Sequence, residues 1–165
     1  MSEDLLGGSV VDLPKLNFPV TYAFEIQMEE EKAMVLDPLR RKFVRLTPEE
    51  WVRLHLVQYL IQTLGYPEGL TAIETGFIYQ GMQCRADVLV HARNGKPVLM
   101  GECKAPDIKL KQNVFDQIGR YNTSLKANYL LVTNGITHFC CEIDREKGSY
   151  EFLESVPKYT DLNFE

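Results

Sequence analysis

Residues 85–104 read RADVLVHARNGKPVLMGECK, two apolar runs separated by an Asn-Gly pair. An Asn-Gly pair between such runs is a strong signal for a β-hairpin that is closed by a two-residue type I′ turn. If Asn94 and Gly95 form this loop, Arg93 pairs with Lys96, and the register of the whole hairpin follows by counting outward. The sequence therefore predicts two antiparallel strands with a defined pairing.

This register gathers charged side chains at the open end of the hairpin. Asp87 falls opposite Glu102, and Arg85 falls opposite Lys104. Directly opposed residues share a face of the sheet, and alternation along the strand puts Lys104 on the same face as Glu102. Opposed like charges destabilise a strand pair, and a core-facing carboxylate is costly unless it is paired or metal-bound. A divalent cation such as Mg²⁺, held by both carboxylates, would remove the repulsion.

These residues resemble the signature of a known superfamily. Asp87, a hairpin, and then Glu102-Cys103-Lys104 are similar to the D…(D/E)-x-K motif of the PD-(D/E)xK nucleases, most of all to the N-terminal nuclease domain of type I restriction enzyme R subunits. Arg85-Ala86-Asp87 stands where many members have Pro-Asp. The resemblance implies an α/β (α+β) protein with a restriction-endonuclease-like αβββαβ core, in which helices flank a mixed central sheet.

The order of predicted elements matches this core. Thr47, Pro48 and Glu50 provide an N-cap, a first-position proline and a glutamate three residues past the cap, so a helix is predicted to run from here to about Leu64. Three strands, a second helix and a terminal β-meander are predicted after it, at about 71–80, 84–92, 97–104, 109–126, 128–133, 136–143 and 148–153.

The second predicted helix carries a further pair of interest. Gln117 and Tyr121 are four residues apart on the apolar stripe that should face the sheet. The pair resembles the Gln-x-x-x-Tyr motif that follows E-x-K in the RecB-like and type I branches of the superfamily. The alternative is a buried glutamine whose amide is bonded to the backbone.

Composition indicates a single globular domain, with 45% hydrophobic and 25% charged residues among 165. We expect an N-terminal arm with a possible edge strand at 1–34, the nuclease-like domain at 35–156 and a tail at 157–165. No apolar run reaches the length of a membrane span, and no secretion signal is visible, so the expected location is the cytoplasm. The four cysteines lack metal-binding spacing and are expected to be free thiols.

The formal net charge of −5 argues against a dedicated nucleic-acid binder, because neutralising phosphates supplies most non-specific affinity. Binding would then depend on local basic residues. The candidates for contact with nucleic acid are Arg85, Lys109, Lys111 and Arg120. A second basic cluster is either a solvated surface or a phosphate-contacting strip, and it consists of Arg40, Arg41, Lys42 and Arg45.

The resemblance implies a Mg²⁺- or Mn²⁺-dependent deoxyribonuclease. In this interpretation Asp87 and Glu102 are catalytic metal ligands, completed by the Cys103 carbonyl and by Glu50, with Glu49 as the fallback for Glu50. Lys104 would orient the attacking water, and the Gln-x-x-x-Tyr pair would position Lys104 or a phosphate. For Glu50, the alternative role is only to close the capping box.

Two other functional classes remain open. The chain could be a nuclease fold without catalysis that binds nucleic acid or protein, or it could be a purely structural domain. The sequence contains no glycine-rich phosphate loop, so no nucleotide cofactor is expected. DNA is the expected partner, together with a second copy of the chain or a partner protein.

Overall fold

A computed structural model describes residues 13–164 of the chain. Its centre is a six-stranded sheet in the order β4-β5-β6-β7-β8-β9. The strands are Thr71–Tyr79, Met82–His91, Pro97–Cys103, Tyr129–Thr133, His138–Asp144 and Ser149–Leu153. β6 and β7 are parallel, and the other neighbouring pairs are antiparallel. The mixed sheet and the terminal meander are those predicted.

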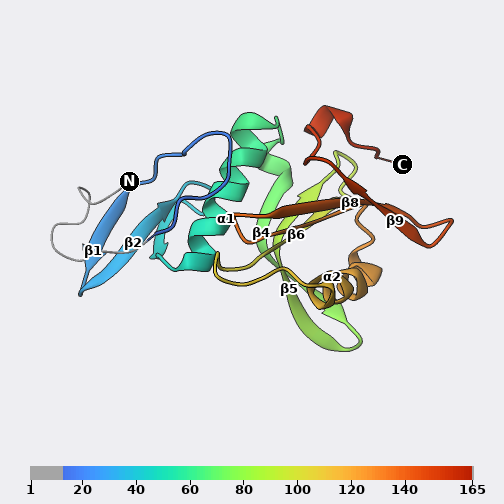
Figure 1. Ribbon diagram of the computed structural model, residues 1–165, viewed down its shortest axis with the longest axis horizontal. Coiled ribbons are helices and arrows are strands. Elements are labelled where there is room, and N and C mark those ends of the chain that lie inside the picture. Colours follow the sequence, from blue (N-terminus) through green and yellow to red (C-terminus); the bar gives the residue numbers. More distant parts are fainter. Residues whose placement is uncertain (1–12, 165) are drawn as a thin grey trace.

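Two helices cover opposite faces of this sheet (Figure 1). α1 comprises Pro48–Gln58 and continues as a π-helical turn over Tyr59–Thr63, whereas α2 comprises Gln112–Leu125 and connects β6 to β7. The predicted helix start is confirmed, because the Glu50 N–H donates to Oγ1 of Thr47 at 3.1 Å. Short 3₁₀ turns lie at Glu68–Leu70 and Tyr159–Asp161.

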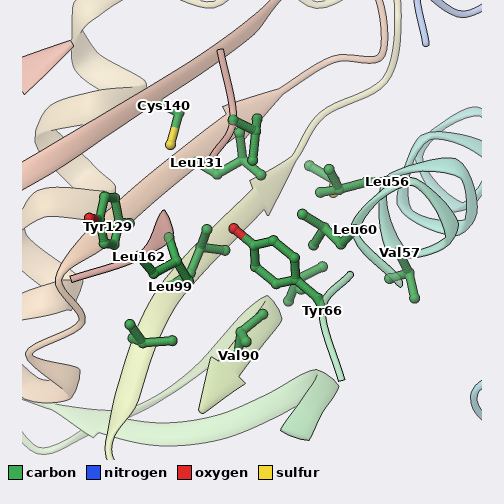
Figure 2. Packing of buried hydrophobic residues seen from close by; sticks show 14 of the residues in the cluster. Leu56, Val57, Leu60, Tyr66, Val90, Leu99, Tyr129, Leu131, Cys140 and Leu162 are labelled. Carbon is green, nitrogen blue, oxygen red and sulfur yellow. The ribbon is translucent and has the colours of Figure 1, made fainter. Parts of the chain in front are cut away.

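The core consists of two layers, one under each helix. On the α1 side, the central residues are Leu56, Leu60, Tyr66, Leu99 and Leu131, which point toward one another in Figure 2. On the α2 side, the layer is formed by Leu89, Met100, Ile118, Leu130 and Val132. Burial on both faces explains why the central strands read as nearly continuous apolar runs.

The turn of the β5–β6 hairpin differs from the prediction. The Gly95 N–H donates to the Ala92 carbonyl at 2.9 Å, and the Ala92 N–H donates to the Lys96 carbonyl at 2.8 Å. The loop therefore has three residues, with Gly95 at φ +85°, and the predicted Arg93–Lys96 pair is wrong. A register shift between Val90 and His91 offsets the extra loop residue. Beyond this bulge the ladder has the predicted register.

A second, three-stranded sheet was not predicted. It has the order β1-β2-β3, formed by Ile26–Glu29, Lys32–Asp37 and Lys42–Arg45. Its buried residue Val35 packs with Leu54 of α1, so the small sheet lies against this helix, away from the central sheet (Figure 1). The turn between β1 and β2 is solvated, with exposed residues at Glu30 and Glu31.

The C-terminal segment expected to form a tail lies against the α1 side of the core. Leu162 is buried, and the Tyr159 N–H donates to the Leu64 carbonyl at 3.0 Å. The hydroxyl of Tyr66 donates to the Pro157 carbonyl at 2.9 Å. Within residues 13–164, no helix combines the length and apolar character needed to cross a membrane. All four cysteines are free, as expected.

Candidate functional site

The site forms where β5 separates from β6. The backbone ladder between these strands ends at the Val88–Gly101 pair, one step before Asp87 and Glu102 would face each other. At the next step the Cys103 N–H donates to the side chain of Asp87, with 2.7 Å between N and Oδ2. The carboxylate thus replaces a backbone acceptor and is held in a fixed orientation. The predicted ladder pair of Asp87 with Glu102 is not formed.

The side-chain alternation of β5 is interrupted at the same point. Ala86 belongs to the core layer under α2, whereas Val88 belongs to the layer under α1. Regular alternation would put Ala86 and Val88 on one face, and the structure places them on opposite faces. On the neighbouring strand, Glu74 lies level with Asp87 and has φ +50°, in the left-handed region. Arg85 pairs with Gly76 of β4 and not with Lys104 as predicted. Irregular backbone in two adjacent strands thus accompanies the change of face.

Despite this irregularity, the predicted convergence of Asp87, Glu102 and Lys104 is confirmed. The ammonium of Lys104 lies 3.3 Å from Oε1 of Glu102, and both side chains are less than a third exposed. Burial and the adjacent Asp87 carboxylate raise the pKa of Glu102 to about 7, while Lys104 acts in the opposite direction. Near neutral pH, the two carboxylates therefore share a space that favours either a proton or a cation.

The buried side chain of Glu50 is held by two arginines. Arg53, one turn further along α1, makes a close ion pair with it, and Nη1 of Arg40 lies 3.2 Å from its Oε1. Nη1 of Arg53 also lies 3.1 Å from Glu74 and 3.9 Å from Oδ1 of Asp87. Glu50 is thus connected to Asp87 through Arg53. The neighbouring Glu49 is exposed.

Arg40 reaches this network from the turn between β2 and β3. Its guanidinium contacts Asp37 at 3.3 Å and Glu74 at 3.2 Å, in addition to Glu50. The connected ion pairs comprise eight groups, namely Asp37, Arg40, Glu50, Arg53, Glu74, Asp87, Glu102 and Lys104. With every group ionised, these five carboxylates and three cations carry a net charge of −2. A single divalent cation would neutralise the set.

Asp37, Arg40, Arg53 and Glu74 are the members of this network that sequence reasoning did not assign to the site. Arg53 could have been noticed as the partner of Glu50 at a spacing of three residues on a helix. Arg40 could likewise have been noticed beside Asp37, three residues earlier. No local pattern marks Glu74, because its partners Arg40 and Arg53 lie on other elements. The rest of the predicted basic cluster consists of Arg41, Lys42 and Arg45, which are exposed, as both a solvated surface and a phosphate-contacting strip require.

The Gln-x-x-x-Tyr pair lies on the outer part of α2. Gln117 is exposed rather than buried as expected, because the face it occupies lies beyond the apolar stripe. Its amide donates to the hydroxyl of Tyr121 at 3.1 Å. The Tyr121 ring packs edge-on against Phe77 and Tyr79 of β4. A role in positioning Lys104 stays a prediction.

The candidate contacts for nucleic acid are all exposed, namely Arg85, Lys109, Lys111 and Arg120. Lys109 and Lys111 lie on the loop that leads from Lys104 to α2. The Asn134 amide donates to the Ile108 carbonyl at 2.8 Å, which ties this loop to the end of β7. Two exposed lysines therefore lie on the chain segment that follows Lys104.

The donor set suits a hard cation. Burial and the neighbouring Asp87 carboxylate raise the pKa of Glu102, and a cation held by both carboxylates would offset the two effects. Among residues 13–164, no three His, Cys, Asp or Glu side chains are grouped closely enough to hold a metal ion. A site built from two carboxylates and the Cys103 carbonyl does not require a third side chain.

The order of helices and strands, and the carboxylates and lysine at the point where two central strands separate, define a restriction-endonuclease-like domain. The chain belongs to the family of the type I restriction enzyme R protein N terminus, whose model matches residues 48–157.

A solved structure with a similar fold supports this assignment. A fragment of a proposed HsdR subunit of a type I restriction enzyme from Vibrio vulnificus has 22% identity and a TM-score of 0.53, and the match covers 71% of this chain. It spans only 24% of that protein's chain. A proposed nuclease from Anabaena variabilis has 14% identity and a TM-score of 0.44, over 78% of this chain and 80% of that one. No curated protein shows a significant match.

Proposed function

We propose that this protein is a metal-dependent endonuclease that hydrolyses DNA phosphodiester bonds. The observation that carries the proposal is the convergence of Asp87, Glu102 and Lys104, in which one carboxyl has a pKa near 7. Family membership supports a nuclease, because the matched family is the N terminus of restriction enzyme subunits. The proposed substrate is DNA, as that family's description suggests.

Asp87, Glu102 and the Cys103 carbonyl would hold Mg²⁺ or Mn²⁺. When bound, this cation supplies polarisation of the phosphate and a lowered pKa of the attacking water. The Cys103 N–H donates to the Asp87 carboxylate and fixes its orientation, so this carboxylate would need little reorganisation when a metal ion binds. Lys104 lies beside Glu102 and would orient the attacking water and offset negative charge that develops on the phosphate.

The exposed basic residues would bind the DNA backbone on either side of the scissile phosphate. Arg85 lies two residues from Asp87 along β5, which corresponds to roughly 7 Å of strand. Lys109, Lys111 and Arg120 would extend the contact toward α2. With a net charge of −5, the chain would bind DNA weakly by itself, so we propose that a second copy or a partner protein contributes affinity.

The test is metal-dependent nicking of a supercoiled plasmid by purified protein, compared with Asp87→Asn. An asparagine can still accept the Cys103 N–H, so this variant removes the charge and preserves the hydrogen bond. Asp161→Asn is the matched control, since Asp161 is exposed near the C-terminus. We expect nicking by the wild type and the control and none by Asp87→Asn. Nicking by Asp87→Asn refutes the assignment.

The acidic composition favours one alternative, a binding module without catalysis. Calorimetry with Mn²⁺ separates the two functions. Tight binding that is lost in Asp87→Asn, together with nicking, supports the endonuclease. A folded wild type that neither binds Mn²⁺ nor nicks the plasmid supports the module.

A further inference from the structure

The guanidinium of Arg53 lies among three carboxylates. It makes a close ion pair with Glu50, and its Nη1 lies 3.1 Å from Oε1 of Glu74 and 3.9 Å from Oδ1 of Asp87. The carboxylates come from α1, β4 and β5, and the arginine comes from α1 itself. A cation thus stands where three separate elements each contribute an acidic side chain.

Because these charged side chains are buried, the arrangement is energetically costly. The Arg53 side chain is 9% exposed and that of Glu50 is 8% exposed. Within the described part of the chain, Nε of Arg53 and Oε1 of Glu50 are buried and make no hydrogen bond. Buried charges are costly unless they are paired. Arg53 donates a hydrogen bond from Nη1 to Glu74, while its buried Nε has no partner, so its set of hydrogen bonds is incomplete.

Asp87 connects this position to the proposed metal site. Its Oδ2 faces the Cys103 N–H, on the side of Glu102, whereas its Oδ1 faces Arg53. A shared carboxylate between two cations that lie roughly 3.5–4 Å apart is typical of two-metal sites for phosphoryl chemistry. In this chain, the second cation next to Asp87 is a guanidinium.

We propose that Arg53 fills a cation position formed by Glu50, Glu74 and Asp87, so that the protein takes up one divalent cation rather than two. This inference rests on the proposed function, because it concerns the same site. Contacts to guanidinium nitrogens keep the carboxylates further apart than the roughly 2.0–2.1 Å oxygen distances of Mg²⁺ would. Arginine stays charged at every relevant pH, so the position remains filled.

The test counts the Mn²⁺ ions bound per chain by calorimetry in the wild type and in Arg53→Met. Methionine has similar length and no charge, so it would open the space between Glu50, Glu74 and Asp87. Arg40 would still pair with Glu50 and Glu74, but these three carboxylates would carry more negative charge than Arg40 offsets, and a metal ion could take the vacated position. We expect Arg53→Met to bind one ion more per chain than the wild type. Arg53→Lys, which restores a cation, and Arg93→Met, on the exposed hairpin loop, should match the wild type.

Loss of a buried counter-charge can prevent folding in the absence of metal. Arg53→Met is therefore also followed by thermal unfolding with increasing Mn²⁺. We expect its melting temperature to rise more steeply with Mn²⁺ than that of the wild type. In Arg53→Met combined with Glu50→Gln, one of the three carboxylates is neutral, and the additional ion should be lost.

Two results overturn the inference. One is a folded Arg53→Met that binds the same number of ions as the wild type. The other is an Arg53→Met that stays unfolded at saturating Mn²⁺, since a metal ion then cannot replace the guanidinium. Failure of the proposed function looks different. A wild type that binds no Mn²⁺ removes the proposed metal site, yet a gain of one ion in Arg53→Met would still support the role of Arg53.

Discussion

Replacing Glu102 with glutamine should stabilise the metal-free protein, and only at higher pH. The pKa of Glu102 is raised to about 7 from a usual 4.5, first by burial and then by Asp87. A raised pKa means that the folded state favours the protonated carboxyl. The contribution of Glu102 to stability is therefore complete below about pH 4.5 and is lost as the pH rises through about 7.

The size of the stability change follows from the difference between the pKa of Glu102 in the folded protein and its usual value. At 1.36 kcal/mol for each pKa unit, the rise in the pKa of Glu102 corresponds to about 3 kcal/mol of unfolding free energy at most. Partial exposure of the side chain and the nearby Lys104 reduce this to about 1–3 kcal/mol. Glutamine is neutral and mimics the protonated carboxyl. Glu102→Gln should match the wild type near pH 4.5 and exceed its free energy of unfolding by about 1–3 kcal/mol near pH 8.

The assay is urea unfolding at several pH values in the presence of a chelator. Glu151→Gln, on the exposed edge strand β9, is the control for removing a carboxylate from the same sheet. The order should reverse when Mn²⁺ is added, because a free concentration roughly a thousandfold above Kd stabilises only the wild type, by about 4.1 kcal/mol. A Glu102→Gln variant that is less stable than the metal-free wild type near pH 8 would refute the reasoning.

Two further substitutions test the site and its support. Gly135→Ala should lower the free energy of unfolding by about 2–5 kcal/mol in urea titrations, because φ is +84° and the new Cβ would lie 2.7 Å from Leu16 and 3.1 Å from Val52. Gly119→Ala, in open space on α2, is its control and should cost nothing, so equal effects would contradict the packing argument. Lys104→Met should reduce plasmid nicking at least about a hundredfold while Mn²⁺ binding persists in calorimetry. Undiminished nicking would remove Lys104 from the mechanism.

Much of the fold was predictable because local signals and long-range packing agree. Thr47 and Pro48 define the start of α1, and Asn94-Gly95 locates the central hairpin. The predicted turn type was wrong, yet the register was right. One extra residue in the loop and one bulge near Val90 offset each other, and the two buried faces leave only one register that satisfies both core layers.

The geometry at Asp87 was harder to predict. Alternation in β5 fails there, but Ala86 is small enough to pack on either face, so the apolar pattern gave no sign of a break. The accompanying left-handed conformation falls on Glu74, a residue type for which positive φ is uncommon. Asp87 and Glu102 converge because the Asp87 carboxylate accepts the Cys103 N–H in place of a backbone carbonyl. The alternation of side chains along a strand does not predict such a contact.

Net charge also proves a weaker guide to function than the sequence suggested. The ion-pair network around Asp87 carries −2 of the total of −5, and several of its members, among them Asp37 and Glu50, are buried. Charges inside such a network act on a bound cation far more than on a DNA backbone at the surface. Part of the acidity that argues against DNA binding therefore belongs to the site that would perform the reaction. Under the proposed function, affinity for DNA would depend instead on the exposed basic residues Arg85, Lys109, Lys111 and Arg120.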